Sequence, residues 1–164
     1  PESLFLNHEV IVDGRNWYPE VAKTELSFDQ VSMLKKHCDK VGIEFLASAF
    51  DETRLQWLEM LHVTRHKVAT RMNKNEPFVR KVLQTKKEVL FSTESTDIPI
   101  SIDFSRISFL YCVPRYPTKL SDLNFMYWKD DCWEGFSDHT QGIEASVYAM
   151  AHETGIIEKH FKLS

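Results

Sequence analysis

Residues 136–161 read FSDHTQGIEASVYAMAHETGIIEKHF, and this stretch decides the fold class. A short apolar strand leads to Phe136, and the segment GIIEKHF ends the stretch as a second strand. Between them, apolar residues recur at the i, i+4, i+7 and i+8 positions of a helix: Ile143, Val147, Met150 and Ala151. Strand, helix and strand in this order predict a parallel βαβ unit, because parallel neighbours need a crossover and the helix provides it.

The same alternation of strands and helices extends upstream to residue 27. Further short apolar runs, rich in β-branched and aromatic residues, predict strands over residues 43–49, 67–70, 88–93 and 107–113. Six strands with helices between them are therefore expected. A short helix is also expected across residues 122–128, whereas residues 94–106 show no helical pattern.

Capping signals mark the ends of the helices before these strands. Ser27 with Gln30 three positions later forms a capping box, an apolar face with spacings of three and four follows, and Gly42 ends the helix. Asp51 is placed to cap a second helix, and Pro77 suits the first turn of a third.

These patterns place the chain in the α/β class. A doubly wound sheet and a (β/α)8 TIM-type barrel both use parallel βαβ units, but no glycine-rich turn follows the first strand to favour a dinucleotide-binding sheet. We therefore expect a partial barrel over residues 27–164, with about six βα units and the first two strands of the barrel not visible. Residues 1–26 lack a sustained period and are expected to form an irregular arm or a long loop.

The composition argues against several classes of function. Of 164 residues, 43% are hydrophobic and 27% are charged, as in an ordinary soluble domain, and the net charge of −4 offers no global attraction for nucleic acid or an anionic membrane. No uncharged apolar stretch approaches the roughly 18 residues that cross a bilayer, so we expect a cytoplasmic protein without nucleic acid or membrane partners. Cys38, Cys112 and Cys132 form no CxxC pair and are interpreted as buried or incidental thiols.

Polar residues stand at the end of every expected strand, where a barrel carries its functional groups. They are Ser48, Thr70, Ser92, Thr93, Tyr116, Ser137, His139, Lys159 and His160. Serine and threonine often end strands only to begin turns, but their repetition along one rim favours a binding site.

His139 and His160 follow consecutive strands, so the two imidazoles should be neighbours at one rim, roughly 5 Å apart. Imidazole is the commonest metal ligand, and two such groups with open positions suit a divalent cation that polarises a substrate oxygen. Structural histidines with ordinary hydrogen bonds are the alternative. Asp138 and Glu158 flank the pair, where orienting the histidines, capping a helix and facing solvent are all open roles.

Several motifs together resemble one known family. The segments SDHTQGIEAS and EKHF, with YCVPRYPT, GIEFLASAFD and ELSFDQ upstream in the same order, are similar to the N-acetylneuraminate (sialic acid) synthase family from about residue 25 to residue 164. The resemblance implies a (β/α)8 barrel that condenses phosphoenolpyruvate with N-acetylmannosamine or a related amino sugar. It also implies a divalent metal, Mn²⁺ or Mg²⁺, held by His139 and His160. A homo-oligomer, expected to be a dimer, is a separate prediction, because an unpaired sheet edge favours association.

The resemblance assigns further residues by position. It implies that phosphoenolpyruvate is held by Ser48, Lys67, Thr70, Ser92 and Ser137. Tyr116, of the RYP segment, matches the tyrosine beside the sugar, and Lys67 supplies charge compensation, so these two residues are the expected catalytic side chains.

The chain also departs from the family pattern. A glutamate expected to act as an acid or a base is replaced by Met72, and an asparagine before the YP segment is replaced by Pro114. The first two barrel strands and the small sugar-contacting domain after the barrel are not seen, so an exposed sheet edge is expected. A degenerate member or fragment that binds a sugar, a phosphate ligand or a partner without turnover is therefore the main alternative, ahead of a metal-dependent hydrolase.

Overall fold

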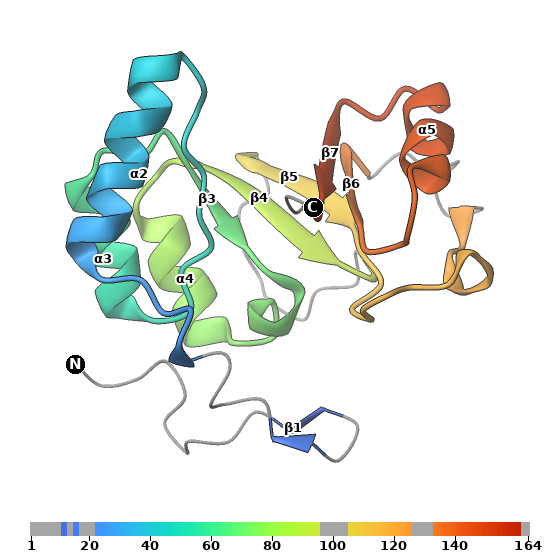
Figure 1. Cartoon of the computed structure of the whole chain (residues 1–164), viewed down its shortest axis with the longest axis horizontal. Helices are drawn as coiled ribbons and strands as arrows, with labels where there is room; N and C mark the ends of the chain where they lie inside the picture. The colour runs from blue at the N-terminus through green and yellow to red at the C-terminus, as the bar shows by residue number, and fades with distance from the viewer. Residues whose placement is uncertain (1–10, 13–14, 17–21, 96–104, 126–132, 162–164) are drawn as a thin grey trace. The chain divides into compact units, whose positions relative to one another are not determined.

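The structure is a computed structural model that describes all residues except 1–10, 13–14, 17–21, 96–104, 126–132 and 162–164 (Figure 1). Its internal contacts divide the chain into two units. The first unit comprises Pro1–Phe45 and Phe50–Val63, and the second comprises Leu46–Ala49 and Thr64–Ser164.

The first unit contains two helices, α2 (Phe28–Val41) and α3 (Glu52–Met60). The predicted capping box is present, since the backbone N–H of Gln30 donates to Oγ of Ser27 and the backbone N–H of Ser27 donates to the Gln30 side chain. Gly42 ends α2 in the left-handed conformation with φ of 75°, which glycine adopts without steric cost. Both predicted ends of α2 are confirmed.

A polar cap and an aromatic contact define the rest of the first unit. The backbone N–H of Arg54 donates to the Asp51 carboxylate at 2.7 Å, as predicted for the start of α3. The rings of Phe28 and Trp57 meet edge to face with centroids 5.6 Å apart, so α2 and α3 contact each other.

The region before α2 contains a short antiparallel pair: β1 (Ile11–Val12) and β2 (Arg15–Asn16).

The second unit is built on a parallel sheet of five strands whose spatial order follows the chain (Figure 1). The strands are β3 (Arg65–Val68), β4 (Glu88–Thr93), β5 (Ile107–Tyr111), β6 (Gly135–Asp138) and β7 (Ile156–Lys159). Every neighbouring pair is parallel, which confirms the α/β class and the βαβ pattern. The described residues thus form part of a barrel-type sheet and do not show a closed (β/α)8 barrel.

The strand predicted over residues 43–49 is wrong as a full strand. Only Ser48 pairs with the sheet, through an isolated parallel bridge to Lys67. Ile43 and Leu46 are 59% and 38% exposed. An apolar run signals a strand only when its backbone also has a neighbouring ladder, and among the described residues this segment has one bridge in place of a ladder.

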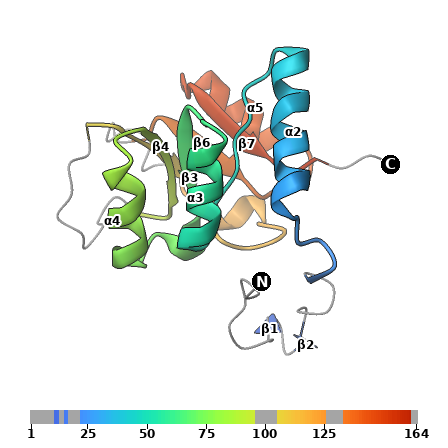
Figure 2. The ribbon, with the colours of Figure 1, turned by 90° about the vertical axis from the view of Figure 1, so that its left-hand side faces the viewer.

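In the described part of the chain, α-helices form two of the crossovers between neighbouring strands. The helix α4 (Glu76–Gln84) joins β3 to β4, and α5 (Glu144–Ala151) joins β6 to β7. In both views α4 lies alongside β4, while α5 lies beside β6 and β7 (Figures 1 and 2). Pro77 occupies the first turn of α4 as predicted, and Asn75 caps it. None of the described helices is both long and apolar enough to span a membrane.

Two short 3₁₀ helices follow β3 and β5: η1 (Thr70–Met72) and η2 (Leu120–Asp122). Of the helix predicted across residues 122–128, Asp122 ends η2, and residues 126–128 lie outside the described residues. Most of residues 94–106, predicted to lack a helix, also lies outside them.

The sheet interior is closely packed around β5 and β6. Leu110 and Phe136 are fully buried, and Phe136 belongs to a cluster with Tyr111 and with Ala145 and Ala149 of α5. A Cβ atom on Gly135 would lie 2.7 Å from Cγ of Leu110 and 3.0 Å from Cβ of Ile156. Glycine therefore allows the neighbouring strands β5 and β7 to bring their side chains over β6.

The helix α5 turns its apolar stripe away from the sheet. Ile143, Val147 and Met150 are 67%, 54% and 62% exposed, whereas Ala145 and Ala149 are buried against Tyr111 and Phe136. The helix predicted from the apolar spacing is present, but small residues form its buried face. Alanine permits a close approach between helix and sheet, so the shortest side chains and not the largest ones mark the inner face here.

Candidate functional site

Hydroxyl, ammonium and carboxylate groups meet at the carboxyl ends of the strands in the second unit. Lys67 lies on β3, Ser92 on β4, Ser137 on β6 and Glu158 on β7. Nζ of Lys67 donates to Oγ of Ser92 at 2.8 Å and lies 3.4 Å from the Glu158 carboxylate, which also accepts a hydrogen bond from Oγ of Ser137. We call these four residues the Lys67 cluster.

The burial of the Lys67 cluster is asymmetric. The Lys67 side chain is 4% exposed, whereas the Glu158 side chain is 43% exposed. A buried ammonium group is costly unless it is paired and hydrogen-bonded, and Ser92 and Glu158 provide these partners. The structure therefore brings together three residues predicted to bind substrate, Lys67, Ser92 and Ser137, and adds a carboxylate to them.

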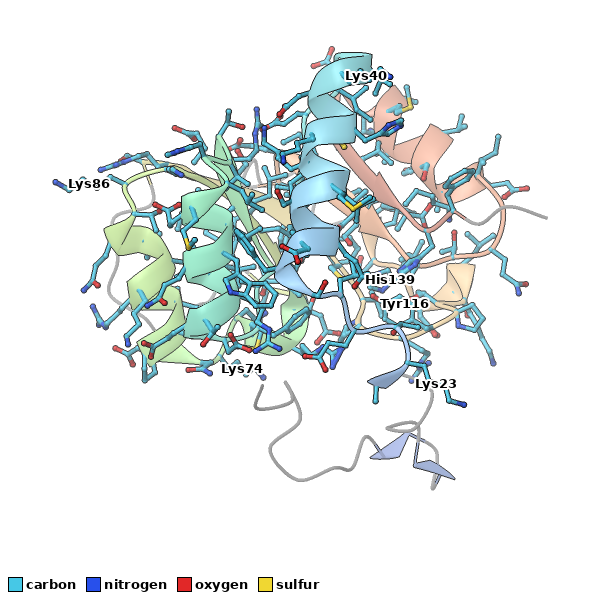
Figure 3. The ribbon with its side chains drawn as sticks, turned by 60° about the vertical axis from the view of Figure 1, so that its left-hand side comes forward. Lys23, Lys40, Lys74, Lys86, Tyr116 and His139 are labelled. Atoms are coloured by element: carbon cyan, nitrogen blue, oxygen red, sulfur yellow. The ribbon has the colours of Figure 1, made fainter. Side chains whose placement is uncertain are left out.

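Three rings gather beyond the ends of β5, β6 and β7. Tyr116 and His139 lie next to each other (Figure 3), and their rings stack with centroids 3.9 Å apart. His160 meets Tyr116 edge-on at 4.9 Å. The centroids of His139 and His160 are 5.5 Å apart, in agreement with the spacing expected for residues that follow adjacent strands. Tyr116, His139 and His160 form the ring cluster.

Hydrogen bonds define the state of the His139 ring. Nδ1 lies 2.9 Å from the carbonyl oxygen of Val113, which can only accept, so Nδ1 carries the proton in the neutral ring. Nε2 lies 2.7 Å from the Tyr116 hydroxyl and accepts its hydrogen bond. Burial lowers the pKa of His139, and the nearby His160 acts in the same direction, although the bond to Val113 opposes the shift. A neutral imidazole is the form that binds metals.

Tyr116 remains a hydrogen-bond donor over the physiological pH range. Partial burial of the phenol raises the pKa of Tyr116 to about 12, and the charges of Cys112 and Glu158 act in the same direction. Its hydroxyl therefore keeps the proton that it shares with His139. The ring is otherwise exposed, which leaves it accessible to a molecule that approaches the ring cluster.

Two other predicted binding residues lie close to this region but make different contacts. Oγ1 of Thr70 donates to Sγ of Cys112 at 3.0 Å, and Ser48 pairs with Lys67 through the backbone bridge. Burial raises the pKa of the Cys112 thiol. Sγ of Cys112 lies 3.9 Å from each of the two ring nitrogens of His139. Cys112 is thus a buried packing thiol, as the sequence suggested.

The Asp138 carboxylate does not point toward the histidines but toward α5. It accepts hydrogen bonds from the backbone and hydroxyl of Thr140 and from Ser146, and it lies 2.9 Å from Nζ of Lys159. Burial alone would raise the pKa of Asp138, but the bonds from Ser146, Lys159 and Thr140 outweigh it and lower the pKa. The residue is structural because it fixes the start of α5 to the end of β6.

The donor chemistry of the ring cluster fits a divalent cation held by two imidazoles. A centroid separation of 5.5 Å is short enough for one ion to bridge both rings at roughly 2 Å per bond. Within the described part of the chain, no group of three or more His, Cys, Asp or Glu side chains is arranged to hold a metal. A cation here would therefore keep its remaining positions for water or substrate, and Nε2 of His139 would have to leave Tyr116.

Sequence reasoning missed the position of Glu158 and the role of the Val113 carbonyl. The sequence indicates Glu158 only as a neighbour of His160, but Glu158 lies on β7, two positions before His160, which directly follows the strand. Alternation along β7 could have indicated that Glu158 reaches Ser137, its direct partner in the sheet register. Nothing in the sequence indicates that a backbone carbonyl fixes the His139 ring.

Comparison with known proteins gives a consistent result. The sequence model of the NeuB family matches residues 5–164. The N,N'-diacetyllegionaminic acid synthase of Campylobacter jejuni is 30% identical over 87% of this chain and 48% of its own length. The human N-acetylneuraminate-9-phosphate synthase is 28% identical over 92% of this chain and 46% of its own.

A solved structure is similar as well. It is an N-acetylneuraminic acid (sialic acid) synthetase from Leptospira borgpetersenii in complex with citrate, with a TM-score of 0.80 and 26% identity. The match covers 90% of this chain and 56% of the Leptospira chain. The chain thus spans about half the length of the curated relatives that it matches.

Proposed function

The chain belongs to the NeuB family, and from this premise we propose that its sheet provides the phosphoenolpyruvate-binding and metal-binding part of a sialic acid-type synthase. Such an enzyme joins phosphoenolpyruvate to an amino sugar and releases phosphate. The relatives carry the names of synthases of different nonulosonic acids, at about 30% identity. N-acetylmannosamine is the acceptor that we propose for a first test.

The observation that carries the proposal is the convergence of the Lys67 cluster and the ring cluster at one end of one sheet. Glu158 and His160 lie two positions apart at the end of β7, and Ser137 and His139 lie two positions apart at the end of β6. Each strand thus contributes one residue to the Lys67 cluster and is followed, two positions later, by a residue of the ring cluster. Phosphoenolpyruvate at the Lys67 cluster and the aldehyde of the acceptor sugar at the ring cluster would then lie next to each other.

Each side chain has a proposed role that its contacts support. The Lys67 ammonium and the hydroxyls of Ser92 and Ser137 donate to phosphate or carboxylate oxygens, because charge-assisted hydrogen bonds hold such groups most strongly. Thr70 and Ser48 lie at the margin of this cluster. Lys67 also compensates the charge that develops as phosphate leaves.

The ring cluster has the second proposed role. Mn²⁺ or Mg²⁺, when bound, would supply Lewis-acid polarisation of the acceptor aldehyde. His139 and His160 would hold the ion, and the neutral His139 tautomer fixed by Val113 directs Nε2 toward it. The exposed Tyr116 ring would pack beside the acceptor sugar.

Two replacements favour a second candidate function, which is ligand binding with weak turnover. Met72 ends η1 at the place where the family resemblance leads one to expect a glutamate, and Pro114 offers no side-chain donor. General acid or base catalysis typically contributes about 10² to 10⁴-fold in rate. We propose that ligand binding persists in this chain even where turnover is low.

Self-association and a cytoplasmic location stay predictions.

Phosphate release tests the synthase proposal directly. The purified chain is incubated with Mn²⁺, phosphoenolpyruvate and N-acetylmannosamine, and inorganic phosphate and the nine-carbon product are quantified. The expected rate is measurable but at least about 10²-fold below that of a full-length family synthase, because the acid or base is replaced. Phosphate release that is independent of the sugar, with no condensed product, would refute the synthase proposal.

A further inference from the structure

We infer that Glu158 is an internal counter-ion that occupies the anion site of the Lys67 cluster in the absence of ligand, and that a phosphate- or carboxylate-bearing ligand binds by displacing it. The inference rests on the proposed function insofar as the site is the same. It adds a property of this site, which is self-occupation by a carboxylate of the chain.

The contacts show that Lys67 and Glu158 are not held equally. Nζ of Lys67 is 2.8 Å from Oγ of Ser92 but 3.4 Å from the Glu158 carboxylate. Charge-assisted hydrogen bonds between an ammonium and a carboxylate are usually about 2.7–2.9 Å long, so the bond to Ser92 is the tighter one. The ammonium is therefore fixed by β4, and the ion pair with β7 is loose.

The difference in exposure indicates which partner can leave. The Lys67 side chain is 4% exposed, whereas the Glu158 side chain is 43% exposed and already borders solvent. When the Glu158 side chain rotates into solvent, water hydrates its carboxylate, and this hydration offsets part of the lost ion pair.

The donors that Glu158 now occupies suit an incoming anion. Glu158 accepts from Ser137 and pairs with Lys67, while Ser92 contacts the same ammonium. When Glu158 rotates away, one ammonium and the Ser137 hydroxyl are left with unused donor capacity, on two strands of one sheet. These groups match the oxygens of a phosphate or a carboxylate, and not those of a neutral sugar.

Charge argues against simultaneous occupancy. A phosphate or carboxylate bound to Lys67 would lie within a few ångströms of the Glu158 carboxylate, and like charges at this distance repel strongly in a partly buried site. The ligand and Glu158 thus compete for one ammonium. Removal of the Glu158 charge, with its shape kept, should strengthen anion binding.

The test compares the full chain with its Glu158→Gln variant by calorimetric titration with inorganic phosphate, phosphoenolpyruvate and pyruvate. We expect phosphate and phosphoenolpyruvate to bind about tenfold or more tightly to the variant, because the competing charge is gone. Pyruvate has a carboxylate but no phosphate, so its titration shows whether a carboxylate alone also binds more tightly to the variant. Glu88→Gln is the matched control, since it removes one carboxylate at the opposite end of β4 and should leave these affinities unchanged.

Thermal unfolding provides a second readout that does not depend on turnover. Without ligand, Glu158→Gln should unfold at a lower temperature than the wild type, because buried Lys67 loses its counter-charge. Added phosphate should raise the unfolding temperature of the variant more than that of the wild type.

The outcomes separate this inference from the proposed function. Anion affinity that is equal or weaker in Glu158→Gln would overturn the inference, as would unfolding temperatures that phosphate leaves unchanged in both proteins. Tighter phosphate binding by the variant, with no preference of either protein for phosphoenolpyruvate over phosphate, would support the counter-ion and contradict the proposed substrate.

Discussion

The hydroxyl oxygen of Tyr116 lies 2.7 Å from Nε2 of His139, and this hydrogen bond occupies the lone pair that a metal ion would need. The other ring nitrogen is held by the Val113 carbonyl at 2.9 Å, so Nε2 is the available ligand atom. Tyr116 and a bound cation should therefore exclude each other at His139. This relationship links the ring cluster to its proposed metal.

Replacement of Tyr116 by phenylalanine should strengthen Mn²⁺ binding. The bond to His139 is lost when the metal binds, and a typical hydrogen bond contributes about 0.5–1.5 kcal/mol, so affinity should rise about twofold to tenfold. Calorimetry with Mn²⁺ measures the change. Tyr148→Phe removes a hydroxyl from α5, away from the ring cluster, and should bind Mn²⁺ as the wild type does. Weaker binding by Tyr116→Phe would mean that the hydroxyl assists the metal.

Alanine at either histidine of the ring cluster should remove metal binding. With two protein imidazoles as the proposed ligands, the loss of one leaves a single donor, and Mn²⁺ affinity should fall by about 100-fold or more. His152→Ala serves as the control, because His152 caps the end of α5 and packs on Tyr148. Unchanged Mn²⁺ affinity in His139→Ala or His160→Ala would exclude the metal site.

Asp138 should make stability depend on acidic pH. Its pKa in the folded chain lies below the ordinary 3.8, so folded Asp138 binds its proton less readily than the unfolded residue does. The contribution of the ionised Asp138 carboxylate to the free energy of unfolding is thus fully present above about pH 5. It is lost as the pH falls from there through the lowered pKa. In Asp138→Asn this part of the acid dependence should disappear, and stability at pH 7 should fall by about 1–3 kcal/mol. Urea unfolding between pH 2 and pH 7 measures both effects.

Gly135 should tolerate no larger side chain. Its Cβ would lie 2.7 Å from Leu110 and 3.0 Å from Ile156, and overpacking of a closed core typically costs about 1–3 kcal/mol. Gly155→Ala is the matched control, because its nearest contact would be the Glu134 carbonyl at 3.8 Å. Chemical denaturation measures the free energy of unfolding of Gly135→Ala and Gly155→Ala. Equal stabilities of the two variants would argue against the packing described for β6.

Local signals in the sequence predicted most of the framework of the sheet. Ser27, Gly42, Asp51 and Pro77 mark helix ends through contacts within a few residues, and each one takes the predicted place. Parallel pairing follows from strand and helix order alone, because the crossover rule depends on connectivity. These features need no knowledge of distant parts of the chain.

Features that depend on distant residues could not be predicted in this way. The run over residues 43–49 has the composition of a strand but pairs only at Ser48, and the buried face of α5 is formed by alanines instead of the apolar stripe. The rim position of His139 followed from a strand end, whereas Lys67 was expected only from the family resemblance. The link from Lys67 to Glu158 depends on how β3 and β7 approach across the sheet. Spacing along the chain carries no information about that approach.

The central claim is that the Lys67 cluster binds phosphoenolpyruvate, and titration of the chain and of Lys67→Met with this ligand tests it most directly. Methionine keeps the volume but removes the charge, so affinity should fall by about 100-fold, whereas Lys74→Met, at an exposed position, should have no effect. Circular dichroism checks that both variants fold. Phosphoenolpyruvate that binds Lys67→Met as tightly as the wild type would contradict the account.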